Sequence, residues 1–479
     1  MEKCLPKIGS EPFIETAELN SPPEELFRHF ENSPEASFLN SSMETDVARF
    51  SFIGIEPFLV LTSKGKNINI RFDGHRLRFK GDPFEYLDSV IRTYRMKKLF
   101  SLPFTSGGIG YLSYDLKDVL EKLPQKAEDD LLLPDLYFVF YRAILIHDRQ
   151  DPGRVKISVI GPETAGREEA KKLIDRIKRM ISSPLPEGRP PKAGKKNFKP
   201  FPESNFTRPG YVKAVKKTID YIRAGDIYQA CLSQRFKTKW PYGAYELYLR
   251  LNEINPAPFS AYLNFEGAKI ISSSPELFLK VSDRMIETRP MKGTRPRGKN
   301  AKEDKKLKDD LKNDPKDASE LAMIVDLERN DLGKVAIPGS VKVIQHKRLE
   351  TYPTVHQTIS VVKGEADAGA SLIDIVKAAF PGGSITGCPK IRAMEIIDEL
   401  EPSKRNVYTG AIGYISFHDT MELNIAIRTM IMKGKDVYFQ AGGGIVADSD
   451  PEAEYQETLH KAQALMTALT HRVCNTPDV

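Results

Sequence analysis

The sequence predicts a large α+β fold. Segments with the 3.6-residue period of helices and segments with the two-residue alternation of strands are mixed along all 479 residues. Several strand-like segments follow one another through links short enough for hairpins, and no regular succession of strand, helix and strand is present. The length corresponds to two or three average domains, or to one large domain with an extension.

The N-terminal part carries the weaker signals. Alternation at residues 58–62 predicts a strand, and residues 84–96 predict a helix. Residues 182–210 are rich in Pro, Gly and Lys without a periodic apolar pattern, which indicates a linker or a surface excursion. We therefore expect an N-terminal region (1–182), a connection (183–208) and a C-terminal region (209–470).

The patterns after the connection are clearer. A helix with Val212, Val215 and Ile219 on one face ends at Gly225, and residues 227–236 alternate as a strand. Further strands are predicted at residues 259–265, 268–272, 408–417, 421–432 and 436–441. Further helices are predicted at residues 317–327, 371–379, 390–400 and 451–469.

Composition excludes several classes of protein. The four cysteines are far apart, which argues against a disulfide scaffold and a thiolate metal site. No apolar run is long enough for a membrane span, and the first residues lack a secretory signal, so we expect a cytoplasmic protein without a membrane partner. The net charge is only +6, and the Lys-rich runs at 192–199 and 295–316 are expected to be solvated surface, the second because acidic residues interrupt it. We therefore expect no nucleic-acid partner, although these runs motivate that alternative.

Two pairs of carboxylates lie on predicted helices. Asp317 and Glu320 are three residues apart, as are Glu454 and Glu457, so each pair shares one helical face. Such a pair alone usually faces solvent, but Glu320 directly precedes an apolar run and the second pair follows a glycine-rich segment. Carboxylates without His or Cys nearby suit Mg²⁺, which we expect as the cofactor.

A site with several carboxylates and an acidic substrate also requires fixed cations. Arg428 is flanked by apolar residues in a predicted strand, which is typical of a paired or ligand-binding guanidinium. Lys461 follows Glu457 by one helical turn. The triple glycine 442–444, expected between a strand and a helix, would let backbone amides approach an anion.

Lys292 is a candidate nucleophile. It lies between Pro-Met and Gly-Thr, with Arg289 and Arg295 close in sequence. Neighbouring cations and partial burial favour the neutral, nucleophilic form of a lysine. A surface turn with a solvated lysine is the alternative, and these residues alone leave both open.

Five motifs in order resemble the chorismate-utilising enzymes, which include anthranilate synthase component I, aminodeoxychorismate synthase component I, isochorismate synthases and salicylate synthases. The resemblance covers residues 209–469. Its motifs are SSSPE (272–276), PMKGT (290–294), MIVDLERNDLG (323–333), FPGGSITGCPKIRAME (380–395) and residues 441–458. It implies two packed β-sheets with helices on their outer faces, in one large unit to which the N-terminal residues contribute strands.

The resemblance also implies roles for individual residues. Glu320 and Glu457 would bind Mg²⁺, with Asp317 and Glu454 close by, and Glu276 would be the general acid that protonates the departing C4 hydroxyl of chorismate. The implied substrate-binding residues are Gly293, Thr294, Ser384, Tyr408, Arg428, Gly443, Gly444 and Lys461, of which Tyr408 and Arg428 would hold the enolpyruvyl carboxylate.

Two positions distinguish members of this family. Where water-using members carry a lysine that activates water, this chain has Gln229, and an amide cannot act as that base. Anthranilate synthases read Pro-Ile-Ala-Gly-Thr where this chain reads Pro-Met-Lys-Gly-Thr. Lysine at this position resembles aminodeoxychorismate synthase component I, in which the amine adds covalently to the substrate. We therefore expect 4-amino-4-deoxychorismate as the product, for p-aminobenzoate and folate biosynthesis.

One departure and one missing part bear on this prediction. Many members carry histidine where this chain has Gln357, and the adjacent His356 should face the other side of its strand. The chain also lacks a Gly-x-Cys-x-Gly nucleophile motif, so we expect a separate glutamine amidotransferase subunit to supply ammonia. The alternatives are anthranilate synthase component I and a catalytically silent binding or regulatory member of the family.

Overall fold

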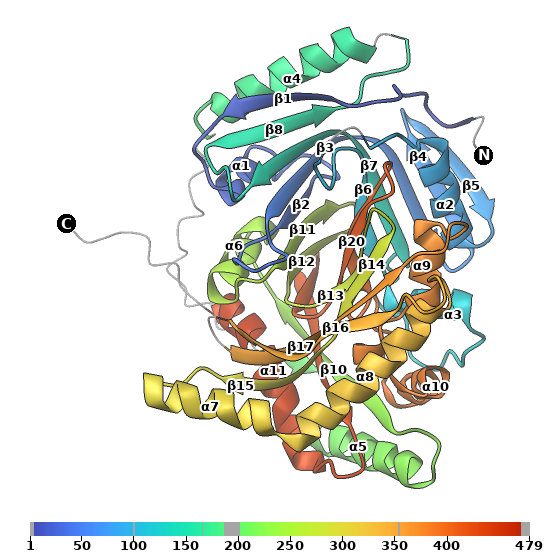
Figure 1. Ribbon diagram of the computed structural model, residues 1–479, viewed down its shortest axis with the longest axis vertical. Helices are drawn as coiled ribbons and strands as arrows, with labels where there is room; N and C mark the ends of the chain where they lie inside the picture. The colour runs from blue at the N-terminus through green and yellow to red at the C-terminus, as the bar shows by residue number, and fades with distance from the viewer. Residues whose placement is uncertain (1–3, 99–100, 165, 186–201, 353–354, 471–479) are drawn as a thin grey trace.

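The computed structural model describes residues 4–98, 101–164, 166–185, 202–352 and 355–470. In these ranges the chain forms 22 strands in one hydrogen-bonded network, together with eleven α-helices (Figure 1). The strands are β1 (Phe13–Glu18), β2 (Ser37–Asn40), β3 (Phe50–Lys64), β4 (Asn67–Phe72), β5 (His75–Lys80), β6 (Gly107–Leu112), β7 (Leu136–Asp148), β8 (Arg154–Val159), β9 (Glu203–Ser204), β10 (Gln229–Lys239), β11 (Phe259–Phe265), β12 (Ala268–Ser274), β13 (Leu277–Ser282), β14 (Met285–Arg289), β15 (Met291–Pro296), β16 (Lys342–Thr351), β17 (Val355–Glu365), β18 (Gly387–Cys388), β19 (Ala411–Ser416), β20 (Met421–Ile425), β21 (Thr429–Lys433) and β22 (Asp436–Ile445). The helices are α1 (Pro23–Arg28), α2 (Pro83–Thr93), α3 (Lys117–Leu120), α4 (Gly166–Ser182), α5 (Arg208–Arg223), α6 (Ala244–Ile254), α7 (Ala301–Asn313), α8 (Pro315–Gly333), α9 (Leu372–Ala379), α10 (Lys390–Leu400) and α11 (Pro451–Thr470), with short 3₁₀ turns η2 (Tyr114–Leu116) and η3 (Gly383–Ile385).

The two halves of the sequence are interleaved in the strand network. Strand β2 pairs antiparallel with β11, and β6 pairs antiparallel with β19. The short strand β9 pairs with β10, so the end of the predicted connection is part of the fold, while residues 186–201 lie outside the described residues. The N-terminal region therefore completes the sheets of the C-terminal region.

Three large apolar clusters show how the layers are stacked. One contains only strand and loop residues, among them Phe52, Tyr137, Leu263 and Ile412, so it lies between two facing β-layers. Neighbouring strand residues point the opposite way: Phe138 belongs to a cluster with α2, α8 and α9. The predicted fold of packed sheets with outer helices is confirmed.

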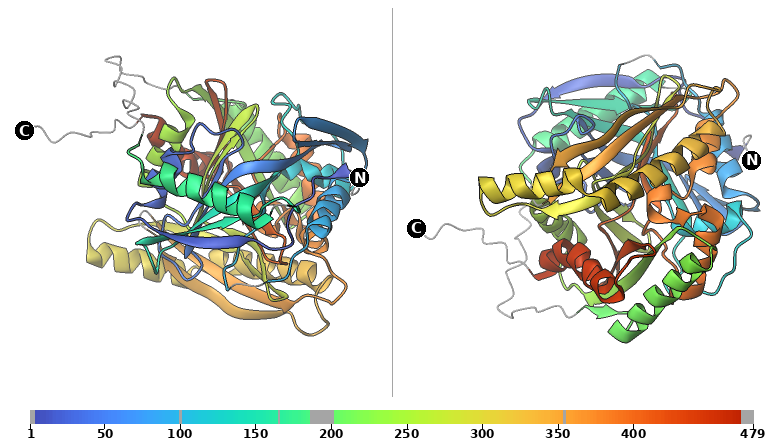
Figure 2. Two further views of the ribbon diagram at one scale, coloured as in Figure 1. Left: turned by 90° about the horizontal axis from the view of Figure 1, so that it is seen from above. Right: turned by 60° about the horizontal axis from the view of Figure 1, so that its bottom comes forward.

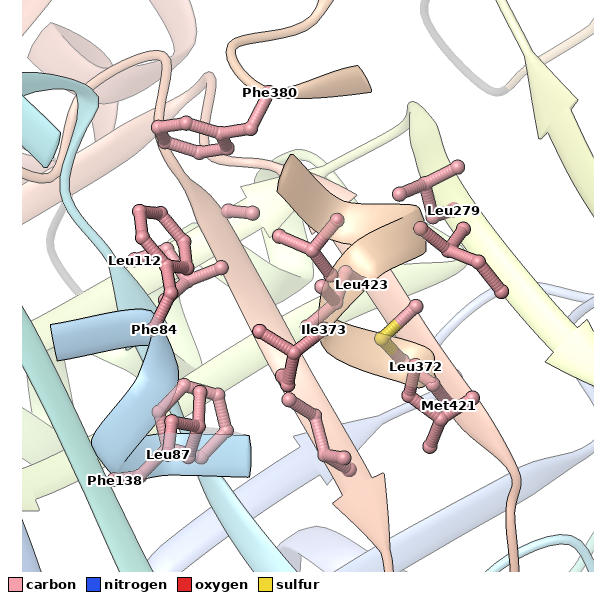
Figure 3. Close-up of a cluster of buried hydrophobic side chains, with 14 of the residues drawn as sticks. Phe84, Leu87, Leu112, Phe138, Leu279, Leu372, Ile373, Phe380, Met421 and Leu423 are labelled. Carbon is pink, nitrogen blue, oxygen red and sulfur yellow. The ribbon is translucent and has the colours of Figure 1, made fainter. Parts of the chain in front are cut away.

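Helices cover both outer faces. Phe84 and Leu87 of α2 and Ile373 of α9 pack on Phe138, Leu423 and other strand residues of the first face (Figure 3). On the other face, α4 lies over β1 and β8, and α6 and α11 contribute to the same cluster (Figure 1). Helices α7 and α8 follow one another across the molecule beside β15–β17 (Figure 2). In the described ranges, no helix is long and apolar enough to cross a membrane.

Two local predictions were wrong. The triple glycine is not a loop but part of β22, where Gly442, Gly443 and Gly444 pair with Ser233, Leu232 and Cys231 of β10. A methyl group on Gly442 would lie 2.5 Å from the Leu232 carbonyl oxygen, so glycine is required by the close approach of two strands.

The predicted strand 421–432 is interrupted between β20 and β21. Arg428 lies in this interruption with a φ of 50°, so it is not a strand residue. These two differences arise because tertiary contacts of single residues override the local pattern. The charged run 295–316 was expected to be solvated surface, and the part of it that forms α7 is mostly exposed, with Leu311 buried.

Candidate active site

Helix α8 positions the first pair of carboxylates. Its N-cap, Asp314, accepts hydrogen bonds from the backbone amides of Lys316 and Asp317, and Pro315 occupies the first turn. Asp317 lies against Gly293 of β15, because a methyl group on that glycine would be 2.9 Å from the Asp317 Cγ atom. The acidic start of α8 therefore faces the strand that carries Lys292.

Lys292 projects into this acidic region. Its Nζ atom lies 3.8 Å from Glu320 Oε2, and its side chain is only 14% exposed. The same Nζ atom would be 3.1 Å from a methyl group on Gly444, so it also lies next to β22. Lys292 is therefore not a solvated turn residue.

The neighbouring arginines were expected to favour the neutral form of Lys292 by their positive charge, but both are bound to carboxylates. Arg289 binds Asp46 and Glu287, and Arg295 binds Asp314 and Asp317. Their charges are balanced by these carboxylates. The charged partner of the Lys292 amine is Glu320.

Helix α11 brings the second pair of carboxylates to the triple glycine. A methyl group on Gly443 would lie 3.1 Å from Glu454 Oε2 and 3.2 Å from Glu457 Oε1, so both carboxylates converge on this residue. Lys461 contacts Glu457 Oε1 at 2.6 Å and donates a hydrogen bond to the Gly442 carbonyl oxygen. Burial acts to raise the pKa of Glu457, but Lys461, with Lys292 and Lys316, outweighs it and the pKa is lowered.

Glu276 is the buried acid of the site. It precedes β13 and is 4% exposed, and burial raises its pKa to about 7. The Ser384 hydroxyl, Lys292, the Met291 amide and Lys461 oppose this effect by favouring the carboxylate. A carboxyl group that holds its proton near neutral pH can act as a general acid.

Two of the predicted substrate-binding residues lie in other surroundings. Tyr408 is buried beside Arg405 and Cys231, and Cys231 pairs with Gly444, which places Tyr408 near the glycine strand. Arg428 donates to Asn255 Oδ1 at 3.2 Å and lies near Tyr352 rather than contacting the carboxylates. Burial lowers the pKa of this guanidinium.

Gln357 and His356 face opposite sides of β17. Gln357 donates from Nε2 to Thr294 Oγ1 at 3.3 Å, whereas His356 is fully buried and contacts Asp304 of α7 at 2.9 Å. His356 therefore cannot take the place of an imidazole at residue 357.

Comparison with known proteins identifies the family of this chain. The sequence profile described as "chorismate binding enzyme" matches residues 36–467. The chain belongs to this family. It is 38% identical to aminodeoxychorismate synthase component 1 of Bacillus subtilis, over 88% of this chain and 89% of the relative. It is also 39% identical to anthranilate synthase component 1 of Aquifex aeolicus, over 88% and 86%. The crystal structure of anthranilate synthase component I from Streptococcus pneumoniae superposes with a TM-score of 0.77 at 33% identity, covering 90% of this chain and 94% of that one.

The carboxylates of this chorismate-binding enzyme fit a magnesium ion in part. Among the described residues, no three His, Cys, Asp or Glu side chains are already grouped as a metal cluster. Glu454 and Glu457 do converge, however, and Glu454 Oε2 is buried without a hydrogen-bond partner. Because Mg²⁺ needs only one or two protein carboxylates, the pair Glu454 and Glu457 offers suitable oxygen donors, and Glu320 lies beside Lys292. Asp317 is already engaged by Arg295.

A further buried carboxylate belongs to the family motif at 323–333 but was not singled out from the sequence. Glu328 of α8 is 8% exposed and accepts a hydrogen bond from Thr288 Oγ1 at 2.9 Å. The signal in the sequence was its spacing of seven, four and three residues from Leu321, Ile324 and Val325, which places it on the buried face of α8.

Proposed function

We propose that this chorismate-binding enzyme converts chorismate and ammonia to 4-amino-4-deoxychorismate, as aminodeoxychorismate synthase component I, for p-aminobenzoate and folate biosynthesis. The observation that supports this product most directly is the placement of the Lys292 amine, 3.8 Å from Glu320 and next to Gly444. Alanine at this position, as in the Pro-Ile-Ala-Gly-Thr turn of anthranilate synthases, has no nucleophile.

The reaction takes place in two substitutions. The lone pair of the neutral Lys292 amine forms a bond to C2 of the ring, the ring double bond shifts, and the C4–O bond breaks. Glu276 gives its proton to the departing hydroxyl, which leaves as water. Ammonia then bonds to C4, the double bond shifts back, the C2–N bond to Lys292 breaks, and the Glu276 carboxylate takes up one proton from the new ammonium.

Gln229 supports ammonia rather than water as the second nucleophile. Its side chain is 1% exposed, and its Nε2 atom lies where a methyl group on Gly444 would be. A neutral amide cannot remove a proton from water, whereas free ammonia needs no base to attack. The side chain therefore suits amination better than hydration.

Chorismate carries two carboxylates, and we assign a different group of residues to each. Glu454, Glu457 and Glu320 would hold Mg²⁺, and the ion would supply positive charge to the ring carboxylate. Lys461 lies beside these carboxylates, and Arg428 with Tyr408 is our candidate for the enolpyruvyl carboxylate. Thr294, Ser384 and the amides of Gly293, Gly443 and Gly444 would complete the pocket.

The ammonia would come from a glutamine amidotransferase subunit. Relatives with both reaction names are called "component 1", which is consistent with a second component. Ammonium salts should replace that subunit in vitro.

A product assay tests the proposal. The purified chain is incubated with chorismate, Mg²⁺ and ammonium salt, with and without an added aminodeoxychorismate lyase. We expect p-aminobenzoate only when the lyase is present. Fluorescent anthranilate formed without lyase would refute the assignment and establish the alternative product, which the anthranilate synthase relatives at 36–39% identity keep open.

The variant Lys292→Ala tests the covalent step. We expect chorismate consumption to fall more than about 100-fold, because no other amine replaces the nucleophile. Lys363→Ala is a matched control, since Lys363 lies on the neighbouring strand β17 and pairs with Glu287, outside the site. A wild-type rate that Lys292→Ala retains would contradict the mechanism, and a wild-type chain without turnover under all conditions would favour the silent family member.

A further inference from the structure

Arg405 is a buried cation that the reaction as described so far does not use. Its side chain is 1% exposed. Two of its hydrogen bonds go to the Glu401 carboxylate, at 2.9 and 2.7 Å, and balance its charge. A buried ion pair is seldom more stabilising than apolar side chains of the same volume, so stability alone does not explain why a guanidinium lies here.

Two further bonds join Arg405 to ordered elements of the site. Its Nη1 atom donates to the Ile385 carbonyl oxygen at 3.0 Å, in η3, the element that contains Ser384. Its Nη2 atom donates to the Cys231 carbonyl oxygen at 2.6 Å, in β10 opposite Gly444. The guanidinium is therefore anchored to two elements that each carry or pair with a predicted substrate-binding residue.

The fifth bond reaches the turn that carries Tyr408. The Arg405 Nη1 atom also donates to Thr409 Oγ1 at 3.3 Å, and the Thr409 hydroxyl donates in turn to the Tyr408 carbonyl oxygen at 2.6 Å. The guanidinium carbon lies over the Tyr408 ring, 5.9 Å from its centre. Tyr408 is therefore held both through its backbone and at the face of its ring.

The same turn has a strained backbone. Asn406 and Thr409 have φ angles of 53° and 60°, in the left-handed region that favours glycine. Thr409 is β-branched, and for such residues this conformation is particularly unfavourable. Strained residues persist only where surrounding contacts hold them, and they occur preferentially at functional sites. The bond from Arg405 to the Thr409 hydroxyl is one of the contacts that hold this turn.

We propose that Arg405 is a positioning residue for chorismate binding: it holds the turn of Tyr408 against η3 and β10, so that the Tyr408 hydroxyl is set for the enolpyruvyl carboxylate. All five N–H groups of Arg405 are already used within the protein, so it acts through Tyr408 and not by touching the substrate. This inference rests on the role that the proposed function gives to Tyr408. It does not depend on which amine product is formed, because both products are made from chorismate.

Arg405→Lys tests this role, because lysine keeps the positive charge beside Glu401 but has only three donors and no planar fork. KM for chorismate and kcat are measured in the complete chain with saturating ammonium and Mg²⁺. We expect KM to rise about tenfold, as for a weakened hydrogen bond to a charged group, while kcat stays within about threefold of wild type. A fall of kcat at unchanged KM would show a merely structural role and overturn the inference.

A double-variant cycle shows whether Arg405 acts through Tyr408. We expect Tyr408→Phe, which removes the hydroxyl, to raise KM for chorismate about tenfold as well. If Arg405 only positions that hydroxyl, the double variant should have a KM within about twofold of that of Tyr408→Phe alone. Effects on KM that multiply in the double variant would contradict the proposal.

Arg235→Lys is the matched control. Arg235 is also a buried arginine over a tyrosine ring, that of Tyr438, and it pairs with Asp130 farther along β10. Its substitution should lower the thermal unfolding temperature and leave KM for chorismate unchanged. An equal rise of KM in this control would show that the effect is not specific to Arg405, and it would count against the role.

A milder variant covers the case in which Arg405→Lys does not fold. Thr409→Val removes the hydroxyl that accepts from Arg405 and keeps a β-branched side chain at the strained position. KM should rise by a smaller factor, and an unchanged KM would again refute the role. A wild-type KM in Tyr408→Phe would instead overturn the binding role of Tyr408, and the inference with it. Product analysis of the same reactions tests the proposed product separately.

Discussion

Replacing Glu276 by glutamine should stabilise the protein above neutral pH while it abolishes turnover. Burial raises the pKa of this carboxyl from 4.5 to about 7. The unfolded chain therefore releases the proton at lower pH than the folded chain, and the folded state loses stability as pH rises from about 4.5 to about 7. Above that window both states are ionised and the loss is complete.

The size of the effect follows from the width of the window. Each pH unit within it corresponds to about 1.4 kcal/mol, so the interval from 4.5 to about 7 corresponds to about 3 kcal/mol. Glutamine does not titrate, and the free energy that it changes by its own burial is the same at every pH. The difference in unfolding free energy between Glu276→Gln and wild type should therefore grow by about 3 kcal/mol between pH 4.5 and 8.

Urea unfolding at a series of pH values, in the presence of a chelator and without substrate, measures this difference. The two proteins share all their other titrating groups. The contributions of those groups therefore cancel in the difference between the two unfolding free energies. A difference that stays constant from pH 4.5 to 8 would show that Glu276 is not a protonated acid in the folded enzyme, and it would remove the basis for its catalytic role.

Two further predictions concern the proposed Mg²⁺ site and the core. Gly443→Ala should raise the Mg²⁺ concentration for half-maximal activity at least about tenfold, because its methyl group would lie 3.1–3.2 Å from the Glu454 and Glu457 oxygens. Gly153→Ala, with open space around it, is the control. An unchanged Mg²⁺ dependence in Gly443→Ala would argue against this site. Arg405→Met should cost about 3–5 kcal/mol of unfolding free energy, because it leaves Glu401 buried at 3% exposure without its cation. The control is Arg92→Met, which removes a 66% exposed side chain from its ion pair with Asp88 and should change the unfolding free energy by less than about 1 kcal/mol. Equal losses in the two variants would contradict the argument.

The sequence was most informative where periodicity and end signals coincided. Residues 390–400 were predicted as a helix and form α10, and residues 259–265 were predicted as a strand and form β11. Ser371 caps α9 with a reciprocal hydrogen-bond pair to Asp374, a signal that can be seen in the sequence. Carboxylates spaced by three on α8 and α11 could likewise be chosen before their partners were known.

Other features depend on contacts that no local pattern contains. Three successive glycines indicate a loop, but Gly442 lies in a strand that pairs with β10. Glycine is needed there because β10 passes too close for a side chain. Apolar neighbours of Arg428 suggested an unbroken strand, whereas the chain turns there into the left-handed region. Glu328 was missed because the polar residues around it in sequence, such as Asp326 and Arg329, suggest an exposed turn of helix, whereas its own side chain lies on the buried face of α8.

The pairing of β2 with β11 and of β6 with β19 means that the two halves of this chain cannot be separated without exposing strand edges. Without the first half of the chain, both C-terminal strands would present bare edges, with unpaired amides and carbonyls open to foreign strands. The C-terminal region is therefore not an independently folding domain that could be excised or fused to another protein. Insertions are better tolerated at surface turns, and a gene broken near its middle would yield two pieces that must find each other before either is complete.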